Sequence, residues 1–247
     1  MLRASAIGPA MLGIVVGCAL AGAPAARAAD PAAIAPPTRE HGATTARLIV
    51  ATRARARLDH PGRGGRRLRP STDWSGQDQV LLVLDSAVRN DRQWLKVLIA
   101  ARPTGSTGWI PRDHVQLSFT RYWIDVRIRT RRVVVYRGGR RIRTYRAVVG
   151  RAATPTPHGL AAVYERNRQP DPDAFLGPWA LSLTATSAVL ENFGGGPGRV
   201  AIHGRSGASL RDPLGSARSH GCIRIDNGPI RFLARTIPVG TPVKLTR

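Results

Sequence analysis

The sequence predicts a mainly β protein built from two successive β modules with short helices. Turn signals recur about every ten residues through residues 46–118, and no apolar run there follows the helical period. Ile124, Val126 and Ile128 then alternate with charged residues, which is the period of a half-buried strand. The chain has 247 residues, of which 43% are hydrophobic, enough for one large domain or two modest ones with packed cores.

Residues 1–28 have the pattern of a secretory signal peptide. Arg3 precedes an uncharged, mostly apolar run, and Ala26-Arg27-Ala28 supplies a small-x-small cleavage site. Two alternatives stay open. Val15-Val16-Gly17-Cys18 resembles a bacterial lipobox, which would make Cys18 a lipidated N-terminus. An uncleaved anchor is the third, because about 20 apolar residues suffice to span a membrane. Each interpretation predicts an exported protein of the cell wall or periplasmic space, which touches a membrane only through this segment or lipidated Cys18.

The first module follows a flexible linker. Residues 29–45 are rich in Ala, Pro and Thr and have no periodicity, which predicts the linker. Residues 46–118 then form a small β module with a basic, Gly-rich loop over 53–69. Its expected strands are the apolar runs between turn signals, at 48–50, 80–84, 94–100, 109–111 and near Val115.

This module resembles the bacterial SH3-like family. The resemblance rests on Trp94-Leu95-Lys96-Val97, followed by Gly108-Trp109-Ile110 and Val115. It implies a small barrel of a kind that often binds wall peptide or glycan. A spacer barrel without a ligand is an equal alternative.

Residues 121–247 are predicted to form the second β domain. Gly138-Gly139 fits a tight hairpin turn, because both residues tolerate positive φ. One helix is expected, capped by Asp226 or Asn227 with Pro229 in its first turn. The expected elements are, in chain order, strands 124–128, 133–136 and 142–149, the helix to about residue 236, and strand 243–245.

The formal net charge is +23, which predicts affinity for polyanions. Anionic wall polymers or phospholipid head groups suit an exported protein. A solvated basic surface without a dedicated partner is an equal alternative, because Arg is spread along the whole chain. The sequence has no helix-turn-helix pattern, zinc-ligand spacing or paired aromatic platform, so no specific nucleic-acid binding is expected.

Cys222 is left without a partner in the mature chain, because Cys18 is either cleaved away or lipidated. Exported domains usually pair their cysteines or have none. An unpaired cysteine indicates a reactive thiol or an intermolecular disulfide, whereas a buried inert cysteine is the plainer explanation.

Two clusters of residues could activate this thiol. His203 follows the short apolar run 200–202, which would place its ring at a strand end as a base. In Ser219-His220-Gly221-Cys222-Ile223-Arg224, the backbone N–H groups of Gly221 and Cys222 are candidate oxyanion donors. Arg224 would face the same side of a strand as Cys222, where it could bind a substrate carboxylate or organise the loop.

Other chemistries fit less well. A lone His is often only a structural hydrogen-bonding group. One cysteine with two nearby histidines makes a weak zinc site, so no metal is expected. The Gly-x-Ser-x-Gly elbow of a serine hydrolase is absent from the sequence.

The same clusters resemble the signature of the YkuD family, the L,D-transpeptidase catalytic domain. Upstream, Thr154-Pro155-Thr156-Pro157-His158-Gly159 resembles the family's first substrate-side loop, and 176–181 resembles the segment before the histidine strand. The resemblance covers about residues 121–246 and implies a β-sandwich domain. Gly204-Arg205-Ser206 departs from the usual His-Gly-Thr run, so an extra charge, Arg205, is expected near the entrance.

The resemblance implies a role for each residue. Cys222 is the nucleophile, His203 is the proton donor and acceptor, and the Gly204 carbonyl orients the His203 ring. His220 and Arg224 shape the acyl-binding site, which includes Gly221, and Ser219 supports the loop.

The implied reaction is two-step acyl transfer on peptidoglycan stem peptides through a cysteine thioester, with neither metal nor cofactor. An L,D-carboxypeptidase, in which water replaces the acceptor amine, and a non-catalytic wall-binding protein are the alternatives.

Overall fold

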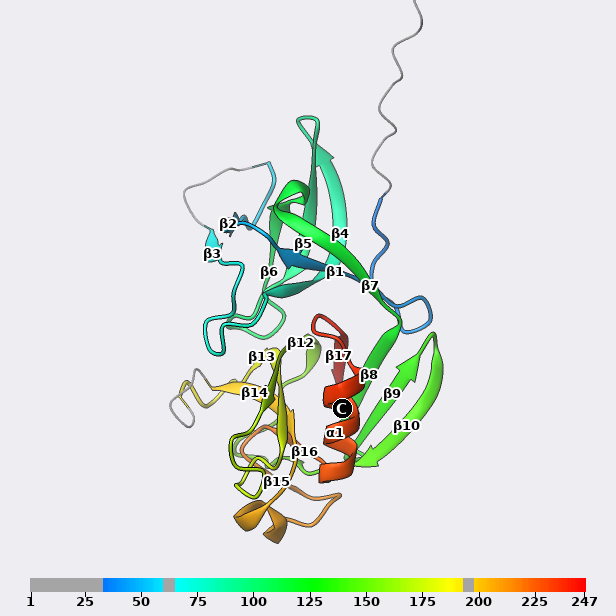
Figure 1. Ribbon diagram of the computed structural model, residues 1–247, viewed down its shortest axis with the longest axis vertical. Helices are drawn as coiled ribbons and strands as arrows, with labels where there is room; N and C mark the ends of the chain where they lie inside the picture. Colours follow the sequence, from blue (N-terminus) through cyan, green and yellow to red (C-terminus); the bar gives the residue numbers. More distant parts are fainter. Residues whose placement is uncertain (1–32, 60–64, 193–197) are drawn as a thin grey trace, which may run out of the picture. The chain divides into compact units, whose positions relative to one another are not determined.

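The computed structural model describes residues 33–59, 65–192 and 198–247 (Figure 1). The described chain is mainly β, which confirms the predicted class. The expected signal peptide and Cys18 lie outside the described residues. No helix in the described ranges is long and apolar enough to span a membrane.

The first sheet is antiparallel and has the strand order β6-β5-β4-β1-β7. Its buried side chains form a core of their own, centred on Leu81, Val83, Leu95 and Ile110. The 3-10 helix η1 (Arg112–His114) joins β6 to β7. The strands are β1 (Ala43–Leu48), β4 (Val80–Arg89), β5 (Arg92–Leu98), β6 (Thr107–Pro111) and β7 (Val115–Thr120).

Two expectations for this module were wrong in detail. The strand expected at 48–50 lies earlier, as β1, so Ala43 to Thr45 belong to a strand and not to the linker. Its buried positions before Leu48 are taken by small Ala and Thr side chains, which carry little apolar signal, while Ile49 and Val50 are exposed. The expected loop 53–69 also contains part of a two-stranded sheet, β2 (Thr52–Ala54) with β3 (Arg66–Leu68).

The second half folds around one eight-stranded sheet of order β10-β9-β8-β17-β12-β13-β14-β16. The C-terminal strand β17 lies in the middle, parallel to β8 and antiparallel to β12. The strands are β8 (Tyr122–Arg127), β9 (Arg132–Arg137), β10 (Arg140–Arg146), β12 (Gly159–Arg168), β13 (Trp179–Thr186), β14 (Arg199–His203), β16 (Ile223–Arg224) and β17 (Pro242–Thr246).

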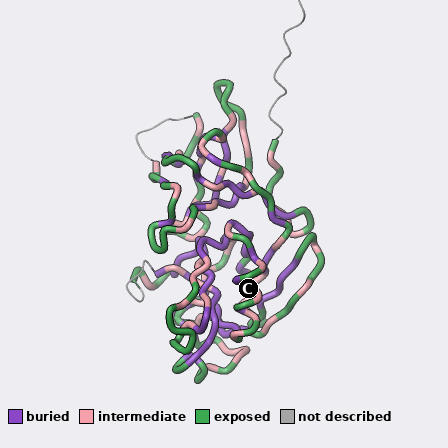
Figure 2. Tube along the Cα trace, in the orientation of Figure 1, coloured by how far each residue is buried: buried purple, intermediate pink, exposed green. Residues whose placement is uncertain are grey.

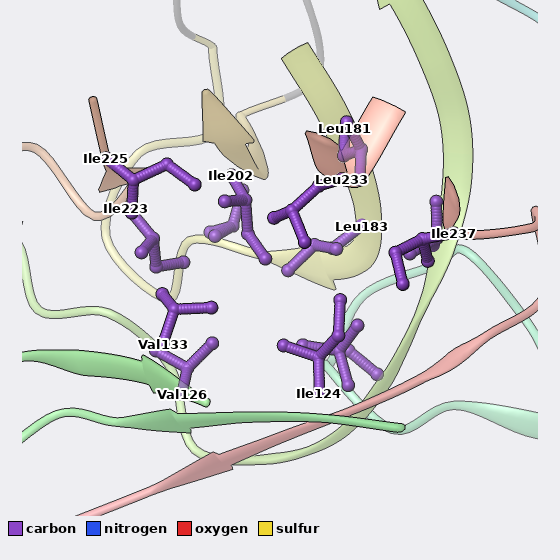
Figure 3. Packing of buried hydrophobic residues seen from close by; sticks show 14 of the residues in the cluster. Ile124, Val126, Val133, Leu181, Leu183, Ile202, Ile223, Ile225, Leu233 and Ile237 are labelled. Carbon is purple, nitrogen blue, oxygen red and sulfur yellow. The ribbon is translucent and has the colours of Figure 1, made fainter. Parts of the chain in front are cut away.

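This sheet curls on itself, so the expected sandwich is one continuous sheet and not two. Ile124 and Val126 of β8 point toward Leu183 of β13 and Ile202 of β14 across a single core (Figure 3). The side chains that β8 and the opposing strands β13 and β14 place in this core are fully buried. Buried residues follow the strands of both sheets (Figure 2). The alternating pattern of β8 therefore supplies one wall of this core.

The predicted helix is confirmed as α1 (Asn227–Thr236), with Asp226 at the N-cap. Ile230, Leu233 and Ile237 bury completely against the sheet core, at about 2 kcal/mol each. Asp226 makes no side-chain capping hydrogen bond, and the side chain of Asn227 accepts the Arg205 N–H instead.

The predicted glycine hairpin is also confirmed, with φ of 54° at Gly138 and 75° at Gly139 between β9 and β10. The expected return strand 142–149 is divided. β10 ends at Arg146, and the chain continues as β11 (Val149–Gly150), which pairs in parallel with β15 (Ala217–Ser219).

Candidate active site

The parallel pairing of β14 with β16 brings the two predicted clusters together. Ile202 lies opposite Ile223 and His203 lies opposite Arg224. Both isoleucines point into the sheet core, so by the two-residue period of a strand His203, Cys222 and Arg224 lie on the other face. Residues 19 positions apart in the chain thus share one small surface.

His203 is held by its own neighbour. Its ring is buried, and Nδ1 lies 2.7 Å from the Gly204 carbonyl oxygen. A carbonyl can only accept, so Nδ1 carries the proton and Nε2 is left as the basic nitrogen. This is the contact implied by the resemblance.

Gly204 has no space for a side chain. A Cβ there would lie 2.5 Å from Asn227 Oδ1 and 3.0 Å from Pro178 Cδ. The close packing explains why glycine follows the histidine.

Burial keeps both candidate groups neutral. It lowers the pKa of His203 to about 4, with a further lowering by the Arg224 charge against the opposing effect of backbone contacts at Gly204 and Leu176. Burial also raises the pKa of the Cys222 thiol, while the Ala201 backbone and Arg224 lower it. Among the described residues no hydrogen bond joins Cys222 Sγ to the His203 ring. The resting pair is therefore a thiol and an imidazole, and not the ion pair considered from the sequence.

Ser219 fixes the loop that carries Cys222. Its hydroxyl donates to the Cys222 carbonyl at 2.6 Å and accepts from the Gly221 N–H at 3.1 Å. Gly221 has a φ of 117°, a conformation that favours glycine. Because its N–H already has an acceptor, Gly221 does not offer the oxyanion donor expected of it. His220, between these residues, is exposed.

The loop that contains Thr154 and Thr156 is hydrogen-bonded to the cysteine loop. Thr156 Oγ1 donates to the Gly221 carbonyl and accepts from the Gly150 N–H, both at 2.9 Å. Thr154 Oγ1 donates to the Ser219 carbonyl at 3.3 Å. The sequence marked this Thr-Pro-Thr-Pro segment by resemblance alone, and the structure shows that its hydroxyl groups hold the cysteine loop.

Arg224 is buried and paired with an acid and an aromatic ring, while its Nε has no hydrogen-bond partner among the described residues. It is 3% exposed, its Nη1 lies 2.5 Å from Asp212 Oδ2, and its Cζ lies 4.7 Å from the Phe175 ring centroid. The Phe175 ring in turn lies 6.2 Å from the His203 ring. Of the two roles left open for Arg224, the structure favours the organising one.

Arg205 was expected to place an extra charge near the entrance, and its side chain is buried. It is 7% exposed, and its Nη2 donates to the carbonyls of Leu210 and Asp212, while Nη1 lies 3.4 Å from Asp226 Oδ1. The carbonyls belong to the 3-10 helix η2 (Gly207–Arg211) and its C-cap. Arg205 therefore stabilises this turn with the charge that was expected near the entrance.

Asn227 clamps the segment after the histidine. Its Oδ1 accepts from the Arg205 N–H at 2.9 Å, and its Nδ2 donates to Ser206 Oγ at 3.3 Å. The sequence named Asn227 only as a candidate helix cap and did not select Asp212 or Phe175 at all, because only their contacts distinguish them. In the described ranges no group of three or more His, Cys, Asp or Glu side chains could hold a metal ion.

The chain has curated relatives that match this domain. It is 34% identical over 125 residues to the YkuD protein of Bacillus licheniformis and 32% identical over 126 residues to that of Bacillus subtilis strain 168. L,D-transpeptidase activity is assigned to both by name only. Each match covers 51% of this chain, and the chain spans 66% of the length of each relative. A solved L,D-transpeptidase from Mycobacterium tuberculosis H37Rv is similar with a TM-score of 0.43 and 15% identity, over 81% of this chain and 95% of that one.

Fold and comparisons together define a mainly β enzyme domain of the transferase class. The family model described as the YkuD L,D-transpeptidase catalytic domain matches residues 121–245, and the chain belongs to this family.

Replacing Thr156 by Val should loosen the cysteine loop. The substitution keeps the shape but leaves the Gly221 carbonyl and the Gly150 N–H without their partner, at about 1–3 kcal/mol for each buried group. Urea denaturation should show a loss of about 2 kcal/mol or more. Thr144→Val, at an exposed position of β10, is the control and should change stability little. Equal stability of the two variants would refute the brace.

The free energy of unfolding should decrease as the pH is lowered, because of His203. The unfolded imidazole titrates near its ordinary 6.5 and the folded one near 4, so above pH 6.5 neither state is charged. As the pH falls from 6.5 to 4 only the unfolded state gains the proton, which costs the folded state up to about 3 kcal/mol. Denaturation at both pH values should show a larger loss for the wild type than for His203→Asn. A variant with the same pH dependence would contradict the assignment.

Asp212→Asn should acidify the Cys222 thiol. The change removes the carboxylate that neutralises Arg224, and the unbalanced guanidinium then favours thiolate more strongly. The pH dependence of Cys222 alkylation, followed by peptide mass spectrometry, should shift to lower pH. Asp226→Asn, which removes the exposed partner of Arg205, is the matched control. An unchanged or raised alkylation pKa in Asp212→Asn would exclude this coupling.

Proposed function

We propose that this chain is an L,D-transpeptidase that cross-links peptidoglycan stem peptides by acyl transfer through Cys222. The observation that carries the proposal is the β14–β16 register, which aligns His203 with a cysteine loop held by Ser219. Membership of the YkuD family supports the same chemistry. The substrate is a tetrapeptide stem, the donor, together with the side-chain amine of a neighbouring stem, the acceptor.

In the first half-reaction the thiol of Cys222 loses its proton to His203 Nε2 and attacks the carbonyl that follows an L-configured centre. The C–S bond forms, the C–N bond breaks, and the leaving D-amino acid takes the proton from the imidazolium. A buried imidazolium with a pKa of about 4 is a strong acid, so it protonates the leaving amine readily.

In the second half-reaction the acceptor amine attacks the thioester. The new C–N bond forms as the C–S bond breaks, His203 takes the amine's proton, and that proton returns to the Cys222 sulfur. The positive charge of Arg224 stabilises the thiolate in both halves, in line with its lowering of the thiol pKa.

The oxyanion donor in this proposal is the backbone N–H of Cys222. Thr156 Oγ1 donates to the Gly221 carbonyl, which lies in the same peptide plane as the Cys222 N–H and so orients that donor. Gly221 contributes the positive φ that turns the loop, and His220 flanks the acyl group from the exposed side. Gly204 orients the His203 ring.

The finer assignments of the rest of the chain belong to the same proposal. Residues 1–28 act as the export signal and residues 46–118 as an SH3-like module that binds wall peptide or glycan. The SH3-like assignment is supported by the pairing of Trp94 with Pro111 and of Lys96 with Trp109 between β5 and β6. Residues 121–247 are the catalytic domain, which works without metal or cofactor.

Cys222→Ala should abolish the formation of cross-linked dimers from purified disaccharide tetrapeptide. Removing a covalent nucleophile costs about a thousandfold or more in rate. Liquid chromatography with mass spectrometry of the products measures it, and Arg218→Gln, an exposed change in the preceding strand, is the control that should retain activity.

The products also separate the alternatives. Dimers support transpeptidation, whereas trimmed monomers alone would show a carboxypeptidase. Wild-type activity in Cys222→Ala would exclude the thioester, and a wild-type chain that binds wall sacculi without forming either product would be a wall-binding protein.

A further inference from the structure

The charged side chains of the hairpin formed by the end of β8, β9 and β10 are all positive. Between Asp125 and Glu165 the sequence has ten Arg and no Asp or Glu. We call residues 127–146 the arginine hairpin. It carries nine of the ten, and they are Arg127, Arg129, Arg131, Arg132, Arg137, Arg140, Arg141, Arg143 and Arg146.

The strand register sets some of these arginines against each other. Arg132 of β9 lies directly opposite Arg127 of β8 on one side and Arg146 of β10 on the other. At the far end of the hairpin Arg137 lies opposite Arg140. Like charges directly opposed across strands destabilise a sheet. The hairpin therefore keeps an arrangement that is unfavourable unless an anion is bound.

No ion pair joins a carboxylate of the described chain to an arginine of the hairpin, and Glu40, which packs against the Gly139 turn, is paired with Arg39. Asp125, the nearest acid in sequence, lies 3.9 Å from Arg39 instead. Some of the arginines contact neutral groups, as Arg127 does with the Tyr136 hydroxyl and Arg146 with the Leu214 carbonyl. Five are exposed, and their side chains make no hydrogen bond, ion pair or ring contact within the described ranges. They are Arg129, Arg131, Arg132, Arg140 and Arg141.

We propose that the arginine hairpin is a binding surface for a linear polymer of phosphate diesters. Guanidinium groups remain charged at any working pH and match phosphate oxygens in bidentate geometry. β10 is an edge strand, seven residues long, so its charges extend over about 20 Å, a length that suits a chain of repeated phosphates.

A bilayer is the less suitable partner. Membrane-surface elements combine basic residues with large apolar side chains that insert among the lipids. The exposed large apolar side chains of the described chain lie outside the hairpin, and they are Ile49, Val50, Trp74, Val88, Phe119, Phe175, Val189 and Leu210. The hairpin thus offers charge without an apolar anchor.

The arginine hairpin is connected to the cysteine loop through β11 and β15. β10 leads through 147–148 into β11, which pairs with β15, and β15 ends at Ser219. A polymer held on the hairpin would remain near the site of acyl transfer. The binding itself does not depend on the transpeptidase activity, so either can fail without the other.

The test compares two variants of equal charge. One replaces Arg129, Arg131, Arg132, Arg140 and Arg141 of the hairpin by Gln. The control replaces five exposed arginines of the first module by Gln, and they are Arg53, Arg66, Arg67, Arg69 and Arg89. The probe is fluorescent poly(glycerol phosphate), titrated by anisotropy at several salt concentrations.

The hairpin variant should bind at least tenfold more weakly than the wild type, with a slope of log K against log salt smaller by about 3, whereas the control should stay within about threefold. The single variant Arg132→Gln should melt at a higher temperature than the wild type in the absence of polymer, because two like-charge pairs are relieved. Polymer should raise the melting temperature of the wild type more than that of the hairpin variant.

Three results would overturn the proposal. The first is an equal loss of affinity in both variants, which would assign binding to the overall charge. The second is hairpin-dependent binding to phosphatidylglycerol vesicles without hairpin-dependent binding to the polymer. The third is hairpin-dependent binding of single-stranded DNA that is tighter than binding of poly(glycerol phosphate).

Discussion

The parallel pairing of β14 with β16 is the constraint on which the site depends. A two-residue strand has few hydrogen bonds of its own, and its register is set by Ile223, which must bury beside Ile202. A slip of one residue would expose Ile223 and turn Cys222 into the core. The apolar packing of the curled sheet therefore determines which face carries the thiol.

Several weak contacts protect this short strand against rearrangement. Ser219 and Thr156 hold the loop before it, and α1 begins directly after it and anchors in the core. Asn227, at the start of α1, also binds the segment that follows His203. The same helix therefore ties down both the nucleophile loop and the histidine turn, which links the precision of the site to the stability of the core.

Much of this arrangement was predictable, and the failures have physical reasons. Strong alternation identified β8, and paired glycines identified the hairpin, because these signals are local. β1 was misplaced because its buried positions before Leu48 are Ala and Thr, whose pattern is visible only once the partner strands are known. His203 and Cys222 were recognised by motif, but their protonation states depend on burial. The hydrogen bonds of Arg205 were not predicted, because sequence does not show which carbonyls a folded turn leaves open.

One buried guanidinium group, that of Arg224, acts on the two ends of the proton transfer in opposite ways. Arg224 lowers the pKa of the thiol and also that of the imidazole. Stabilising the thiolate favours transfer of the proton, while destabilising the imidazolium opposes it, so the charge does not create a resting ion pair. Its benefit comes later, when the proton moves on to the leaving amine and only the anionic centre is left to stabilise. Asp212 limits this field by pairing with Arg224 at 2.5 Å. The site thus keeps the nucleophile neutral until a substrate occupies it, which spares a solvent-accessible thiolate from side reactions.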